Sequence, residues 1–117
     1  MGYSWGGYAG GLLAGLHAPV KAYVLTYAGA DWVAADPAAA KGFLDPAAAV
    51  AGSRGAAFLF QDGVADPLFS RASVTRYYEA APGPKTLRWY PGGHGDFWQE
   101  PDGAAVTVHR RWFERNL

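Results

Sequence analysis

Residues 2–7 read GYSWGG, so Ser4 has a glycine two residues before it and another two residues after it. In the pattern Gly-x-Ser-x-Gly, the serine sits on a sharp, strained turn between a strand and a helix, and its hydroxyl stands clear of the backbone. We expect both flanking glycines to be required, because a Cβ at either place would clash as strand and helix close on each other. The alternative is a glycine-rich turn with a solvated serine, since 16 of the 117 residues are glycine and short motifs arise by chance.

The composition indicates a single folded domain. Hydrophobic residues make up 50% of the chain and charged residues 17%, a balance that favours a buried core over disorder. The formal net charge is zero, which argues against a nucleic-acid partner or a polybasic membrane contact. The chain has no cysteine, which excludes a disulfide, a thiolate nucleophile and a cysteine metal site.

No targeting or membrane segment is visible in the sequence. No apolar run approaches the roughly 20 residues that a membrane-spanning helix needs, and the N-terminus does not have the pattern of a signal peptide. We therefore expect a cytoplasmic protein without a membrane partner.

Three segments are expected to form strands. The runs AYVLTY at 22–27 and AAFLF at 56–60 are continuously apolar, as is typical of strands buried on both faces of a sheet. The run TLRWY at 86–90 gives the third strand.

The segments between these strands are expected to be helical. Asp36 and Asp45 each precede a proline, the pattern of a helix N-cap followed by the first helical residue. Longer helices are expected over 5–16, over 70–81, and from a start after 101–103 to an end near 116. Helices that alternate with strands predict an α/β fold, a parallel sheet with flanking helices and right-handed crossovers.

Polar residues follow two of the expected strands. Residues 61–67, after the second strand, read QDGVADP, and residues 91–97, after the third, read PGGHGDF. In parallel sheets, ligands bind beyond the carboxyl ends of the strands. An aspartate and then a histidine therefore follow Ser4 along the chain, each placed where a site is expected.

The order serine, aspartate, histidine is the one used by the α/β-hydrolase fold, and the chain resembles the C-terminal half of an α/β hydrolase. The resemblance is to the dienelactone-hydrolase-like and prolyl-oligopeptidase-like branch, and it runs the whole length of the chain. GYSWGG at 2–7 resembles the nucleophile elbow of that branch, FQDGVADPLFS at 60–70 its acid loop, and YPGGHGDF at 90–97 its histidine loop.

This resemblance implies a serine hydrolase. It places Ser4 on the nucleophile, Asp66 on the acid and His94 on the base. Dienelactone hydrolases use a cysteine nucleophile, so the serine favours an esterase or a peptidase, with a small-molecule ester or a peptide as substrate. No cofactor is expected.

The chemistry of such a triad assigns a role to each residue. A serine hydroxyl is a poor nucleophile until a base removes its proton, and His94 is the well-placed base. Asp66 would hold the imidazole in the right tautomer and stabilise the imidazolium as it forms. The backbone N–H of Trp5 would supply one donor of the oxyanion hole.

Each of these assignments has an alternative. Asp66 could be an Asx-turn residue, with Asp62 as the acid, but Asp62 precedes the loop glycine and lies too near the strand. His94 could be a turn histidine among glycines. His17 and His109 are expected to be structural or solvated.

The histidine loop also raises the question of a metal site. His94-Gly95-Asp96 carries two ligand types, but no third ligand has a suitable spacing, so no metal is expected. Aromatic side chains that flank the loops are candidates for a substrate pocket, with core packing as the alternative. The candidate pocket residues are Tyr3, Trp32, Phe43 and Phe97.

The resembled fold places several further strands before the elbow, and this chain has three residues there. Strand 22–27 would then present an unpaired apolar edge, through which the chain could self-associate. We therefore expect a partial α/β-hydrolase domain over 1–117, without its N-terminal half and with little activity alone. The alternatives are a non-catalytic interaction piece, or half of a split hydrolase that pairs through this edge, and an acyltransferase on the same scaffold.

Overall fold

The computed structural model describes residues 1–31, 44–96 and 103–117. Its sheet has four strands in the order β1-β2-β3-β4, and all neighbouring strands are parallel. In chain order the elements are β1 (Gly2–Tyr3), α1 (Trp5–Gly15), β2 (Ala22–Thr26), α2 (Pro46–Ala51), β3 (Ala57–Gly63), α3 (Arg71–Ala80), β4 (Lys85–Tyr90) and α4 (Ala104–Asn116). The predicted α/β fold with a parallel sheet and flanking helices is confirmed.

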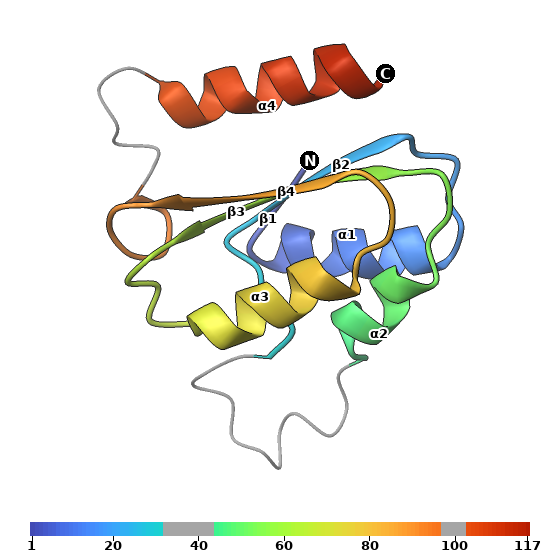
Figure 1. Ribbon diagram of the computed structural model, residues 1–117. Coiled ribbons are helices and arrows are strands. Elements are labelled where there is room, and N and C mark those ends of the chain that lie inside the picture. Colours follow the sequence, from blue (N-terminus) through green and yellow to red (C-terminus); the bar gives the residue numbers. More distant parts are fainter. Residues whose placement is uncertain (32–43, 97–102) are drawn as a thin grey trace.

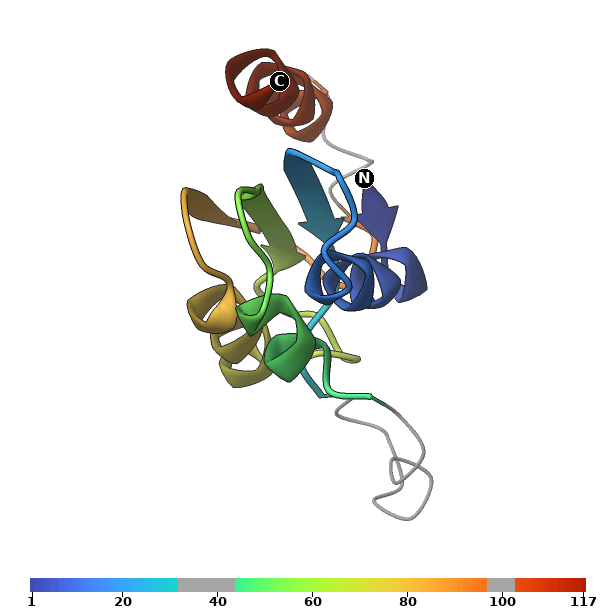
Figure 2. The same cartoon turned by 90° about the vertical axis from the view of Figure 1, so that its right-hand side faces the viewer.

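The helices cover the two faces of the sheet unequally. Among the described elements, helices α1, α2 and α3 lie on one face and α4 lies on the other (Figures 1 and 2). Phe58 and Phe60 of β3 pack on the first face with Tyr77 of α3. Leu59 packs on the second face with Trp112 of α4. Successive residues of a strand thus pack into opposite cores, which explains the apolar runs 22–25 in β2 and 57–60 in β3.

Strand β3 is longer than the sequence predicted. The apolar run ends at Phe60, yet β3 continues to Gly63 because its pairing with β4 continues, with Asp62 opposite Trp89 and Gly63 opposite Tyr90. Gln61 and Asp62, expected in a loop, are therefore buried in the sheet.

A short strand precedes the serine, where the sequence analysis started the chain with a helix. Gly2 and Tyr3 form β1 and pair with Leu25 and Thr26 of β2. Two residues suffice here because the backbone N–H of Ser4 also donates to Thr26 at 2.8 Å. The three strands expected after the serine are β2, β3 and β4.

Two helices begin with side-chain caps, and the sequence predicted the first of them, at Asp45. The Asp45 carboxylate accepts from the backbone N–H of Ala47 at 2.9 Å and starts α2. The Ser70 hydroxyl accepts from Ser73 at 3.1 Å and starts α3. The cap expected at Asp36 lies outside the described residues. No helix in the described ranges is both long and apolar enough to pass through a membrane.

The close approach of β1 and α1 depends on only one of the two glycines that flank Ser4. A Cβ on Gly2 would lie 2.0 Å from the carbonyl oxygen of Gly6, so this position admits no side chain. A Cβ on Gly6 would meet nothing within 4 Å, so the expectation that Gly6 is required was wrong. Gly7 is a second tight position, because its Cβ would lie 2.6 Å from that of Ala28, in the loop after β2.

Candidate active site

Ser4 lies at the turn between β1 and α1 in a strained backbone conformation. Its φ is 50° and its ψ is −112°, a combination that residues with a Cβ rarely adopt. Two backbone hydrogen bonds hold the turn: the N–H of Ser4 donates to Thr26 at 2.8 Å, and the N–H of Tyr8 donates to the carbonyl of Ser4 at 3.0 Å. The turn presents the hydroxyl beyond the carboxyl end of the sheet.

Asp66 lies in the loop that follows β3. Backbone hydrogen bonds from Asp66 to Gly63 at 3.2 Å and from Ala65 to Gly92 at 2.9 Å fix this loop against the one after β4. Oδ1 of Asp66 accepts the backbone N–H groups of Leu68 at 2.7 Å and of Phe69 at 3.2 Å. The carboxylate is fully buried, and these two amides set its orientation.

His94 lies in the loop after β4, between two glycines. Gly92 and Gly95 both have a φ of 92°, which is open to glycine but strained for other residues. Nδ1 of His94 lies 2.7 Å from Oδ2 of Asp66, and Nε2 lies 3.1 Å from Oγ of Ser4. Three side chains from three strand ends are thus joined in one chain of hydrogen bonds.

Aromatic rings enclose the imidazole and leave one edge open to solvent. The ring centroids of Tyr27, Tyr3 and Phe69 lie 5.2, 5.8 and 6.0 Å from that of His94. The His94 side chain is 17% exposed. Tyr3, a candidate pocket residue, therefore packs beside the histidine, and the other three candidates, Trp32, Phe43 and Phe97, lie outside the described residues.

Trp5 is the first residue of α1, directly after Ser4. Its backbone N–H belongs to the first turn of the helix, whose amides have no acceptor within the helix. The aligned peptide dipoles also favour negative charge at this end. An anion that forms next to the Ser4 hydroxyl would therefore meet a favourable field.

Asp62, which the sequence placed too near the strand to be the acid, lies beside Asp66 in the structure. Its side chain is fully buried, and its Oδ1 accepts the backbone N–H of Gly63 at 2.8 Å. Its Oδ2 is buried without a hydrogen-bond donor among the described residues. Burial foremost, together with the charge of Asp66 and a hydrogen bond to it, raises the pKa of Asp62 to about 8, against the opposing effect of backbone amides.

The orphan oxygen and the raised pKa have one explanation. Two carboxylates cannot hydrogen-bond to each other, but a protonated Asp62 can donate to the carboxylate of Asp66. The sequence did hold a signal for this residue: Phe58, Phe60 and Asp62 alternate along β3, so Asp62 shares the face of a strand that packs under helices.

The other two histidines lie away from this site. His17 follows α1 and is exposed, while His109 of α4 is buried, and burial lowers its pKa. In the parts of the chain that the structure describes, no group of three or more metal-binding side chains comes together.

Comparisons with known proteins add to the geometry. No family model and no curated protein matches the chain. The esterase domain of a Rhodothermus marinus protein has a similar structure, with a TM-score of 0.62 and 20% identity over 80% of this chain. A protein assigned as a dienelactone hydrolase from Klebsiella pneumoniae subsp. pneumoniae aligns over 97% of this chain, with a TM-score of 0.68 and 21% identity. The chain has an α/β-hydrolase-type fold.

This likeness confirms the predicted resemblance at the level of the fold. The aligned region makes up 49% of the Rhodothermus chain and 50% of the Klebsiella chain, so this chain spans about half the length of each.

Proposed function

We propose that the chain carries the active site of a serine hydrolase that cleaves an ester or peptide bond through an acyl-enzyme. One observation carries the proposal: Nε2 of His94 lies 3.1 Å from Oγ of Ser4 while Nδ1 lies 2.7 Å from Oδ2 of Asp66. A nucleophile in contact with a base, which a buried acid orients in turn, is the arrangement that nucleophilic catalysis requires.

In the proposed reaction, Nε2 of His94 takes the proton of the Ser4 hydroxyl as Oγ attacks the carbonyl carbon of the substrate. The tetrahedral intermediate collapses when the imidazolium gives this proton to the leaving alcohol or amine. Water then repeats the sequence on the acyl-enzyme with His94 again as the base, which releases the acid and restores the serine. Asp66 orients the imidazole and stabilises the imidazolium.

The N-terminus of α1 supports the charge that develops in this reaction. The tetrahedral intermediate carries a negative oxygen, and Trp5 at the start of α1 places its amide next to Ser4. Donors fixed in advance at such a position stabilise the transition state without reorganisation, and the loss of one costs roughly 10²–10³ in rate.

The substrate class rests on the nucleophile. The two similar structures are an esterase domain and a protein assigned as a dienelactone hydrolase, and their likeness to this chain extends to the fold. The serine favours an ester or peptide over a dienelactone. We expect low turnover from the chain by itself, because it spans about half the length of each similar structure.

Hydrolysis of p-nitrophenyl esters of increasing acyl length tests the proposal. We expect a burst of p-nitrophenol equal to the enzyme concentration, followed by slow turnover as the acyl-enzyme hydrolyses. Ser4→Ala and His94→Gln should each reduce the rate by roughly 10³-fold or more, whereas His17→Gln, at an exposed position after α1, should not. Activity that survives Ser4→Ala would overturn the proposal, and ethanol as acceptor would reveal acyl transfer as an ethyl ester.

A further inference from the structure

Tyr27 has a backbone conformation that bulky residues rarely adopt. It lies directly after β2, and its φ is 50°. Glycine enters this left-handed region without strain, whereas a residue with an aromatic ring is an outlier there. Strain of this kind persists only where the surrounding structure over-determines it, and it occurs preferentially at functional sites.

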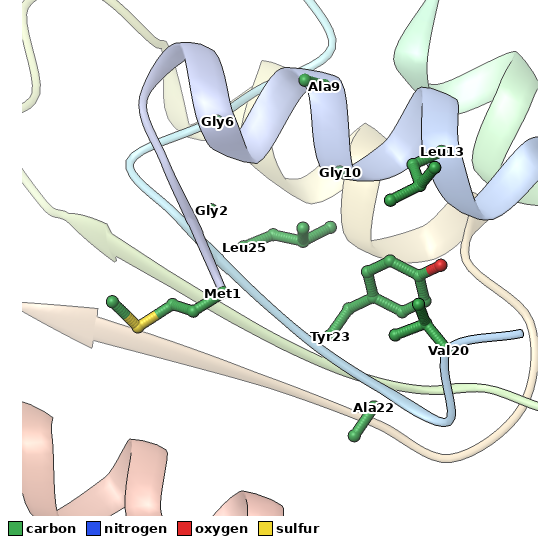
Figure 3. A pocket seen from close by; sticks show the side chains of 10 residues that line it. All are labelled: Met1, Gly2, Gly6, Ala9, Gly10, Leu13, Val20, Ala22, Tyr23 and Leu25. Carbon is green, nitrogen blue, oxygen red and sulfur yellow. The ribbon is translucent and has the colours of Figure 1, made fainter. Parts of the chain in front are cut away.

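The strained turn moves the Tyr27 side chain to the other face of the sheet. Along β2, Tyr23 and Leu25 point toward α1, whereas Ala22 points away from it (Figure 3). Strict alternation would place Tyr27 with Tyr23 and Leu25, on the face that α1, α2 and α3 cover. Its ring belongs instead to the cluster that contains Ala105 of α4, the helix on the opposite face. The left-handed backbone thus takes the ring out of the alternation.

In this position the Tyr27 ring lies against the imidazole of His94. The two ring centroids are 5.2 Å apart, and the ring planes meet at 55°. The contact is shorter than those that Tyr3 and Phe69 make with His94, at 5.8 and 6.0 Å. Tyr27 is fully buried, and a close-packed interior leaves a side chain little room to shift. Its ring is therefore a firm wall on one side of the imidazole.

Two contacts hold Tyr27 itself in place. Its backbone N–H donates to the carbonyl of Gln61 at 2.7 Å, which ties residue 27 to β3 although β2 has ended. The ring of Tyr3 stands nearly edge-on to that of Tyr27, with centroids 5.5 Å apart and planes at 69°, an arrangement that aromatic pairs favour. Because Tyr3 directly precedes Ser4, this second contact connects the wall to the strand that carries the serine.

The hydrogen bonds of His94 leave a need for such a wall. A histidine side chain turns about two single bonds, and each hydrogen bond fixes only one atom of its ring. Nδ1 is fixed by the buried Asp66 at 2.7 Å, whereas Nε2 meets Ser4 at 3.1 Å. A bulky group packed against the imidazole restricts both torsions and so keeps Nε2 in place.

We propose that Tyr27 is a positioning residue, whose ring holds the imidazole of His94 in the orientation in which Nε2 meets Oγ of Ser4. Its effect on reaction rate rests on the proposed function, but its restraint of the imidazole does not depend on catalysis. The contact is made by the ring, so phenylalanine should substitute for Tyr27. A residue that merely fills the core would have no special influence on His94.

The rate at which a fluorophosphonate labels Ser4 tests the effect on reactivity. Tyr27→Leu removes the ring and should slow labelling at saturating reagent by roughly 10²-fold, because a misplaced base lowers the rate of the chemical step. Tyr27→Phe keeps the ring and should be labelled at about the wild-type rate. Phe58→Leu is the matched control, since Phe58 is as deeply buried and stacks with Tyr23. It should also be labelled at about the wild-type rate.

Proton NMR tests the restraint on the imidazole without reference to catalysis. The Nδ1–H proton of His94, hydrogen-bonded to Asp66, should give a sharp downfield signal at low temperature, and His94→Gln should remove it. We expect this signal to broaden or vanish in Tyr27→Leu, because the freed ring samples several orientations. The signal should persist in Tyr27→Phe and in Phe58→Leu.

The two measurements separate this inference from the proposed function. A folded Tyr27→Leu chain that keeps either the NMR signal or the wild-type labelling rate would overturn the role of Tyr27. An equal loss of the signal in Phe58→Leu, or its absence from the wild type, would also overturn it. If the signal is lost in Tyr27→Leu alone but Ser4 of the wild type is never labelled, the restraint stands and the proposed function fails.

A second variant covers the case in which Tyr27→Leu does not fold, which urea unfolding would reveal. Tyr27→Met then takes its place, because the unbranched side chain of methionine fills irregular gaps in a core. The same loss of signal and of labelling rate is expected from this variant, and retention of either would overturn the role of Tyr27.

Discussion

Asp62 and Asp66 place two carboxyl groups side by side at the carboxyl end of β3, both shielded from solvent, and only Asp66 contacts His94. Because two buried negative charges in contact are unfavourable, the pair holds a proton at neutral pH, and the pKa of about 8 places this proton on Asp62. The protonated carboxyl group can then donate a hydrogen bond to the acid that orients the histidine.

This proton should make stability depend on pH. The unfolded chain loses it above the ordinary value of 3.8, while the folded chain keeps it up to about 8. Within this window the folded state binds the extra proton, so the free energy of unfolding falls as pH rises. The Asp62→Asn variant cannot titrate at this position. Its free energy of unfolding should therefore rise relative to that of the wild type by up to about 1.4 kcal/mol per pH unit.

Urea unfolding of both chains at pH 5, 6, 7 and 8 measures this difference. The comparison isolates Asp62 and its coupling to Asp66, because the remaining titratable groups are the same in the two chains. If the free energies of unfolding of the wild type and of Asp62→Asn changed in parallel from pH 5 to pH 8, Asp62 would be ionised in the folded chain at neutral pH. That result would exclude the shared proton.

The strained backbone at Ser4 should be visible in a comparison of two variants that both lack the hydroxyl. A φ of 50° and a ψ of −112° cost little for glycine but strain any residue with a Cβ. We therefore expect Ser4→Gly to be more stable than Ser4→Ala by about 1 kcal/mol. Thermal unfolding of the two variants gives the sign of the difference in stability. Equal stability of Ser4→Ala and Ser4→Gly would mean that the turn relaxes when the side chain changes.

Replacement of either of two glycines of α1 by alanine should change the free energy of unfolding, in opposite directions for the two positions. Gly6→Ala adds a methyl group to open space and improves helix propensity, which should stabilise the chain by about 0.5–1 kcal/mol. Gly11→Ala would place its Cβ 1.8 Å from the hydroxyl oxygen of Tyr77, and overpacking of this kind costs about 1–3 kcal/mol.

The second substitution should also disturb a buried hydrogen bond. The Tyr77 hydroxyl donates to the carbonyl of Gly7 at 2.9 Å, so a displaced ring would lose this contact as well. Chemical denaturation of the two alanine variants checks the prediction. A change of the same sign in both would show that helix propensity outweighs packing along α1.

The sequence predicted those parts of the fold that depend on local pattern. The apolar runs of β2 and β3 were predicted to be buried on both faces, and Asp45 was predicted to cap a helix, because each of these features depends on a few neighbouring residues. The proximity of Ser4, Asp66 and His94 could be predicted from the sequence, because the carboxyl ends of parallel strands lie at one edge of the sheet. Their catalytic roles remain predictions.

What depends on pairing between distant segments could not be predicted in the same way. The end of β3 is set by its partner β4, so Asp62 looked like a loop residue although it lies in the sheet. A Cβ on Gly6 meets nothing within 4 Å, which no local pattern reveals. The tight positions, Gly2 against the Gly6 carbonyl and Gly7 against Ala28, follow only from the packing of α1 on the sheet.

Covalent labelling shows whether His94 activates Ser4 as a nucleophile. The chain is treated with a fluorophosphonate, and the modified residue is located by mass spectrometry. We expect one adduct, on Ser4, that His17→Gln leaves in place and His94→Gln removes. No adduct on Ser4, an equal yield on Ser53, Ser70 or Ser73, or a Ser4 adduct that persists in His94→Gln would contradict it.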